Sequence, residues 1–85
     1  MKINADLTFN VQGTDKTCKG FCRNLSHTGI QFETAHALSG GQMIEVVLSS
    51  KDVRIKPLRA LTEVLRVDVI DRTTYQVSGK IVRYK

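Results

Sequence analysis

Asn24, Ser26 and Gly29 follow one another in the order N-x-S-x-x-G, within the stretch CRNLSHTGIQFET at residues 22–34. An Asn amide both donates and accepts hydrogen bonds, so it can pair with the edge of a nucleobase, and a Ser hydroxyl can rotate to serve a base or a phosphate oxygen. Gly29 permits a turn with positive φ and close approach of the backbone to a flat ring. The same residue types also build a hairpin corner whose side chains bond to their own backbone. The motif alone therefore leaves a nucleotide pocket and a plain turn as alternatives.

Two cysteines and two histidines form a second candidate set, with the spacing C-x3-C-x4-H-x8-H at Cys18, Cys22, His27 and His36. If TCKGFC is a strand, the two cysteine Cα atoms lie roughly 13–14 Å apart. A disulfide needs about 4.4–6.8 Å between them, and one zinc ion with Zn–S bonds of about 2.3 Å could not hold both thiolates. We expect two reduced thiols and no metal.

Catalytic residues are not arranged in any pattern that the sequence makes recognisable. Ser26 and His27 are adjacent, so their side chains diverge in a strand or turn, and no carboxylate is placed by sequence to orient His27 as a base. No Gly-rich, phosphate-cradling loop precedes a helix. We expect a protein that is not an enzyme and carries no cofactor.

The chain has 85 residues, of which 41% are hydrophobic and 25% charged, so it is expected to form one small globular domain over residues 1–85. No apolar run approaches the roughly 20 residues that span a bilayer, and MKINADLTF lacks the apolar stretch of a signal peptide. A cytoplasmic domain without membrane contact is expected, including one excised from a longer protein.

The net charge of +5 is concentrated in the second half of the chain. Its densest cluster is KDVRIKPLR, with Lys51, Arg54, Lys56 and Arg59. A positive surface favours an anionic partner, although lysines also protect strand edges from aggregation. A small barrel that binds nucleic acid through this cluster is one alternative. The three Phe and two Tyr argue against it, because most read as inward-facing whereas single strands stack on exposed aromatics. We expect no nucleic-acid partner.

Apolar runs separated by turn-forming residues predict strands throughout the chain. The expected strands cover residues 7–11, 17–25, 30–34, 43–49, 53–67 and 75–82, with turns at 12–16, 26–29, 50–52 and 68–74 and a loop at 36–42. Gly20 indicates a bulge or a close backbone approach, and Pro57 must interrupt its strand or hold it at an edge. The pattern predicts an all-β fold, a small six-stranded antiparallel β-barrel. The predicted core comprises Phe9, Cys22, Ile30, Phe32, Ile44, Val46, Val64, Val77 and Ile81.

The segment 58–66 has a second interpretation. Leu58, Leu61 and Leu65 are spaced three and four residues apart, as in a short amphipathic helix. The valines nearby and the β elements on both sides favour a strand.

These elements together resemble the PilZ domain, a bacterial receptor module for cyclic di-GMP. The resemblance covers nearly the whole chain, through the strand with Gly20 and Cys22, then NLSHTGIQF, L-x-x-G-Q-M-I-E-V-V-L, EVLRV and YQVSGKIV in matching order. Its sharpest element is Asn24-x-Ser26-x-x-Gly29, which is similar to the family motif [D/N]-x-S-x-x-G. The resemblance implies a second-messenger receptor that relays its signal to a partner domain or an unknown protein effector.

The resemblance also implies which residues touch the ligand. Asn24 and Ser26 would contact cyclic di-GMP, and Gly29 would shape the corner. Arg23, His27 and Arg66 are further candidates for ligand contacts, although a regular strand would point Arg23 opposite to Asn24.

One departure from the family pattern bears on function. Cyclic di-GMP binders of this family usually carry R-x-x-x-R just before the first strand, where arginines stack on guanine and clamp phosphate. No arginine precedes Leu7, and no two arginines of the chain have that spacing. Either the arginines were removed with an upstream segment, or the chain is a degenerate PilZ-like domain that serves as a protein–protein interaction module.

Overall fold

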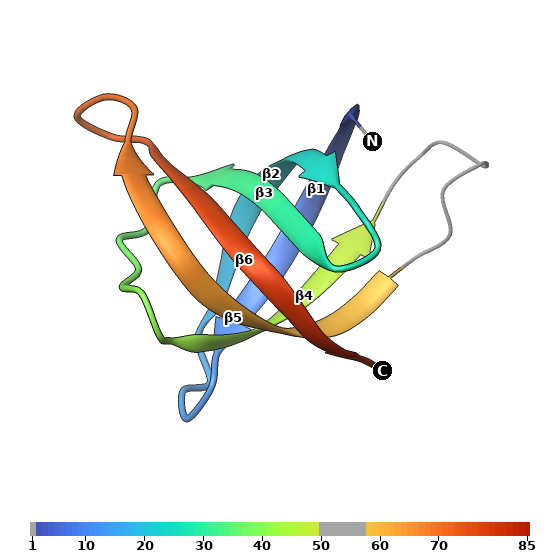
Figure 1. Ribbon diagram of the computed structural model, residues 1–85. Coiled ribbons are helices and arrows are strands. Elements are labelled where there is room, and N and C mark those ends of the chain that lie inside the picture. The colour runs from blue at the N-terminus through green and yellow to red at the C-terminus, as the bar shows by residue number, and fades with distance from the viewer. Residues whose placement is uncertain (1, 50–57) are drawn as a thin grey trace.

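A computed structural model describes residues 2–49 and 58–85, which form a closed barrel of six antiparallel strands (Figure 1). The strands are β1 (Lys2–Val11), β2 (Thr17–Leu25), β3 (Gly29–Thr34), β4 (Met43–Ser49), β5 (Leu58–Val69) and β6 (Tyr75–Tyr84). They are neighbours in the order β1-β2-β3-β6-β5-β4 around the barrel, and β4 closes it against β1. The described residues contain no helix long and apolar enough to cross a membrane. The predicted fold class is confirmed.

Strand β1 is longer than the sequence pattern predicted, because it begins at Lys2 and not at Leu7. Ile3 and Ala5 are buried and continue the inward alternation of Leu7 and Phe9. The backbone of Lys2 lies opposite Asn24 of β2. The start of β1 therefore lies beside the N-x-S-x-x-G motif.

The helical alternative for residues 58–66 is wrong, and the preferred strand is confirmed. Ala60, Thr62 and Val64 alternate into the barrel and are fully or almost fully buried, whereas Leu65 is exposed. Burial thus follows a period of two and not the leucine spacing. The strand continues through Val69, so the turn before β6 covers residues 70–74 and is shorter than predicted.

The barrel interior holds every residue of the predicted core, each of them at most 7% exposed. The Phe9 and Phe32 rings lie at the centre with centroids 5.3 Å apart. Leu38 also belongs to this core, although it comes from the 35–42 loop. The sequence pattern missed it because an apolar residue in a loop has no periodic neighbours.

Both cysteines lie on β2, point into the barrel and are free, as predicted. Cys22 is completely buried, and burial raises the pKa of its thiol to about 11. Gly20 lies on the same face, where an added Cβ would come within 3.0 Å of the Glu33 carbonyl oxygen and 3.1 Å of the Leu7 and Phe32 side chains. The close approach predicted at Gly20 is therefore present.

The predicted basic cluster falls mostly outside the described residues, as do Pro57 and the 50–52 turn. Of its cations only Arg59 is described, and its guanidinium lies 3.8 Å from the Glu45 carboxylate.

Candidate functional site

The turn between β2 and β3 is closed by hydrogen bonds between Ser26 and Gly29. The Ser26 N–H donates to the Gly29 carbonyl oxygen at 2.9 Å, and the Gly29 N–H donates to the Ser26 hydroxyl at 3.0 Å. Ser26 therefore acts as a hairpin-turn residue, because it forms hydrogen bonds with the backbone of its own turn. Its hydroxyl nevertheless stays exposed.

The expected role of Gly29 needs a correction. Among the described residues positive φ values occur only at Gly13 and Gly41, so the turn does not require one at Gly29. A Cβ on Gly29 would meet the Ser26 hydroxyl at 3.4 Å and the Gly79 carbonyl oxygen at 3.6 Å, which is close to ordinary contact. Gly29 therefore keeps the space above Ser26 open and does not relieve backbone strain.

Asn24 does not bond to its own backbone with its side chain, as a simple turn residue would. Its amide Nδ2 donates to the Gln31 Oε1 at 3.1 Å, and the Gln31 Nε2 donates to the Ser78 hydroxyl at 3.4 Å. Strand pairing places Asn24 opposite Gln31, Gln31 opposite Ser78, and Ser78 opposite Arg66. These four residues, from β2, β3, β6 and β5, lie side by side across the outer face of the barrel, and we call them the polar row.

An open pocket of about 270 Å³ lies over the motif end of the polar row. Its lining comprises Asn24, Leu25, Ser26, Gly29, Ile30, Gln31, Ser78 and Gly79. The three motif residues thus line one pocket, as a binding motif requires. The surface combines amide and hydroxyl groups that donate and accept hydrogen bonds with two glycines that carry no side chain, which suits a flat polar ring.

A β-bulge decides where Asn24 points. Cys22 lies opposite Phe32 and Asn24 lies opposite Gln31, so Arg23 is an extra residue of β2. Without it, alternation would direct Asn24 into the barrel together with Cys22. The bulge brings both Arg23 and Asn24 to the outer face, so the expectation that they point in opposite directions is wrong.

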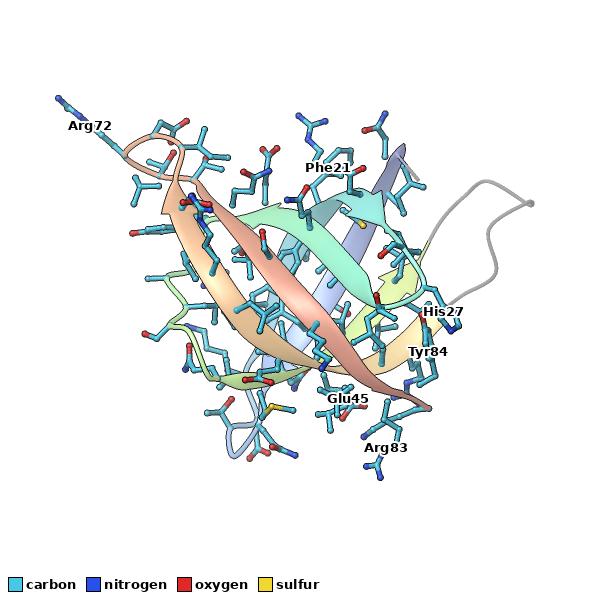
Figure 2. All side chains as sticks on the ribbon, in the orientation of Figure 1. Phe21, His27, Glu45, Arg72, Arg83 and Tyr84 are labelled. Atoms are coloured by element: carbon cyan, nitrogen blue, oxygen red, sulfur yellow. The ribbon has the colours of Figure 1, made fainter. Side chains whose placement is uncertain are left out.

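Arg23 lies outside the pocket lining and is occupied by other groups. Its Nε donates to the Glu33 carboxylate at 2.7 Å, and its guanidinium carbon lies 5.2 Å from the centre of the Phe21 ring. Figure 2 shows Phe21 on the outside of the barrel. Gln31, which lines the pocket, and Glu33 are successive outward-facing residues of β3. The partner of Arg23 is therefore the next outward-facing residue beyond the pocket.

Arg66 ends the polar row but also does not line the pocket. Its backbone lies opposite Ser78, its side chain is 74% exposed, and its Nε donates to Asp68 at 3.0 Å. The structure thus brings a second cation to the opposite side of the pocket from Arg23.

His27 is exposed at the tip of the turn and faces away from the pocket lining. Its ring lies 6.1 Å from the Tyr84 ring, and its carbonyl oxygen accepts a hydrogen bond of 2.7 Å from the Tyr84 hydroxyl (Figure 2). The sequence pattern indicates His27 as a candidate but does not indicate Tyr84 as its partner.

Two polar residues of the pocket, Gln31 and Ser78, were not among the site residues predicted from the sequence. Alternation did place both on the outer face, because Gln31 lies between buried Ile30 and Phe32, and Ser78 between buried Val77 and Gly79. Gln31 lies beside Asn24 through the β2–β3 pairing and its bulge, whereas the proximity of Ser78 depends on the β3–β6 pairing, which no local pattern reveals. Elsewhere in residues 2–49 and 58–85, no group of three or more His, Cys, Asp or Glu gathers in a way that could hold a metal ion.

Comparison with known families identifies one match. The family model described as the PilZ domain matches residues 2–85. No curated protein is similar enough to match the chain.

Proposed function

Because the chain belongs to the PilZ domain family, whose members are receptors for cyclic di-GMP, we propose that it binds this dinucleotide in the pocket of the N-x-S-x-x-G motif. It then acts as a receptor module that relays occupancy to a partner domain or protein and catalyses no reaction. Cytoplasmic location is part of the proposal and fits the free thiols of Cys18 and Cys22, because the cytosol keeps thiols reduced.

The observation that carries the proposal is the convergence of Asn24, Ser26 and Gly29 on one open pocket together with Gln31 and Ser78. The Asn24 Nδ2 donates to the Gln31 Oε1 at 3.1 Å, so the two side-chain amides lie side by side and both present hydrogen-bonding groups to the pocket. The edge of guanine offers acceptors and donors in a similarly flat arrangement. The exposed Ser26 hydroxyl stands ready for a base or phosphate oxygen.

Cations on this face that can balance the phosphate charge of the ligand include Arg23, Arg66 and the exposed Lys80, whose backbone lies opposite Gly29. Arg23 and Arg66 lie on opposite sides of the pocket, although each is paired with a carboxylate. Cations placed ahead of β1 would be a further source, because the backbone of Lys2 lies opposite Asn24. The R-x-x-x-R arginines of the family therefore belong ahead of Lys2 and not within residues 2–6, which are part of strand β1.

The present chain is expected to bind weakly. Each lost charge-assisted contact costs roughly 1.5–3 kcal/mol, so two missing arginines cost about 3–6 kcal/mol, or roughly two to four decades of affinity. One observation favours the alternative of a protein-contact module that has lost the nucleotide: Arg23 and Arg66 are both already paired with acids.

The test is a titration of two chains with cyclic di-GMP, one as printed and one extended ahead of Lys2 by a segment carrying R-x-x-x-R. Calorimetry at fixed salt measures affinity, because the ligand is dianionic and its binding depends on screening. Amide chemical shifts locate it, and we expect changes at residues 24–31 and 78–79. Cyclic di-AMP serves as the ligand control, since adenine lacks the guanine pattern of donors and acceptors.

A matched pair of variants separates a pocket effect from a general one. Asn24→Ala removes an amide from the pocket, whereas Asn10→Ala removes one from β1, outside the pocket lining. Only Asn24→Ala should weaken binding. If neither chain shows shifts at residues 24–31, the receptor function is wrong and the protein-contact module takes its place.

A further inference from the structure

The C-terminal end of β6 contacts the turn that carries the motif. The Tyr84 hydroxyl donates to the His27 carbonyl oxygen at 2.7 Å, and the two rings lie 6.1 Å apart with an angle of 31° between their planes. Three residues earlier, the Ile81 N–H donates to the Thr28 carbonyl oxygen at 2.9 Å. Both peptides of the turn tip are therefore held by β6.

These contacts join the pocket to the end of β6 through very few atoms. His27 and Thr28 are the two residues between Ser26 and Gly29. Ser26 and Gly29 line the pocket. The Ser26 hydroxyl accepts a hydrogen bond from the Gly29 N–H, so the position of the tip and the direction of that hydroxyl depend on each other. A ligand that accepts the Ser26 hydroxyl proton competes with the Gly29 carbonyl oxygen, to which that hydroxyl donates at 3.3 Å, and so disturbs this closed turn.

Tyr84 is placed for this contact and not for core packing. It is 44% exposed, whereas the inward residues of β6 such as Val77 and Ile81 are buried. Its ring lies beside the His27 ring, and its hydroxyl donates to the His27 carbonyl oxygen at the surface (Figure 2). Val82 is an extra residue of β6 in the pairing with β5, and this bulge directs the strand end toward the turn.

We propose that Tyr84 is a positioning residue of the pocket, which fixes the His27 peptide so that Ser26 and Gly29 keep their arrangement. By the same contact, a change at Ser26 reaches the C-terminal end of β6. The part concerning the ligand rests on the proposed function, whereas the coupling of Ser26 to Tyr84 is a property of the protein alone.

The first arm of the test needs no ligand. The chain contains two tyrosines, Tyr75 and Tyr84, so labelling with 3-fluorotyrosine gives two fluorine resonances, which Tyr75→Phe assigns. Ser26→Ala should shift the Tyr84 resonance and leave that of Tyr75, at the other end of β6, in place. Ser39→Ala, an exposed substitution of the same kind in the 35–42 loop, should move neither. An unmoved Tyr84 resonance in Ser26→Ala overturns the coupling.

The second arm uses cyclic di-GMP and the chain extended by R-x-x-x-R. Tyr84→Phe keeps the ring and loses one hydrogen bond, so affinity should fall about threefold to tenfold and the Gly29 amide resonance should shift in the free protein. Unchanged affinity in Tyr84→Phe overturns the positioning role. Failure of the parent chain to bind overturns the proposed function instead, and the first arm still decides the coupling.

Discussion

Arg23 donates from its Nε to the Glu33 carboxylate at 2.7 Å on the outer face of the barrel. Glu33 is the next outward-facing residue of β3 after Gln31, which lines the pocket. This ion pair holds the Arg23 guanidinium at Glu33, outside a site that is expected to take an anion. The side chains are 48% and 26% exposed, so the pair contributes no more than about 1 kcal/mol to stability. Its larger effect concerns where Arg23 points.

We therefore predict that Glu33→Gln strengthens binding of cyclic di-GMP. A guanidinium released toward the phosphates gains a charge-assisted contact of roughly 1.5–3 kcal/mol, so affinity should rise about tenfold or more. Calorimetry at fixed salt measures the gain. Asp15→Asn, in the exposed turn before β2, removes the same charge far from the pocket and should have little effect. Equal gains in both variants would show that only net charge matters.

Substitutions at Gly29 should affect binding much more than folding. Gly29 has no positive φ, and an added Cβ would meet only ordinary or slightly close contacts. The free energy of unfolding of Gly29→Ala should therefore lie within about 1 kcal/mol of that of the parent. Gly29→Val should fill the space above Ser26 and abolish detectable binding while the chain still folds. Urea unfolding and titration of both variants check this. Collapse of stability in Gly29→Ala would restore a backbone role for this glycine.

Ser26→Ala should weaken both the turn and the ligand contact. The lost hydrogen bond from the Gly29 N–H is worth about 1 kcal/mol, and affinity should fall by roughly fivefold if the hydroxyl also touches the ligand. Amide exchange at Gly29 reports the turn and calorimetry reports the ligand. Faster exchange with unchanged affinity would limit Ser26 to the hairpin corner.

Two buried threonines should respond in opposite directions to the same substitution. The Thr62 hydroxyl is buried without a partner among the described residues, so Thr62→Val should raise the free energy of unfolding by about 1 kcal/mol. The Thr34 hydroxyl donates to the Lys19 carbonyl oxygen at 2.8 Å, so Thr34→Val should lower it by about 1–2 kcal/mol. Urea midpoints measure both. A loss of stability in Thr62→Val would mean that its hydroxyl has a partner in solution.

Stability should fall in alkali because of Cys22. Burial raises the pKa of its thiol from 9.0 to about 11, so the folded protein holds this proton more tightly than the unfolded chain. The stabilisation is complete below pH 9 and is lost as pH rises toward 11, at about 1.4 kcal/mol per pH unit. Urea unfolding at pH 7–10.5 measures the slope, which should be shallower in Cys22→Ala. Cys18→Ala is the control, and equal slopes in all three chains would contradict the assignment.

The sequence by itself determined most of each strand and most of the residues that face inward. Alternation is a local property of a strand, since successive side chains point to opposite faces. It therefore sufficed to predict β2 and β4 to the residue and to place Phe9, Phe32 and Val77 in the core. It also sufficed to place Asn24, Ser26 and Gly29 at one turn, because they are close in the chain.

Only the tertiary structure decided how the pocket is assembled. Gln31 and Ser78 are 47 residues apart, and they meet because the closing barrel pairs β3 with β6. The extra residue at Arg23 depends on the registers of β2 against its neighbours, and it turns Asn24 from the interior to the surface. A register is fixed by the sum of contacts on both sides of a strand. The partners of Arg23 and His27 were therefore beyond the reach of any local pattern.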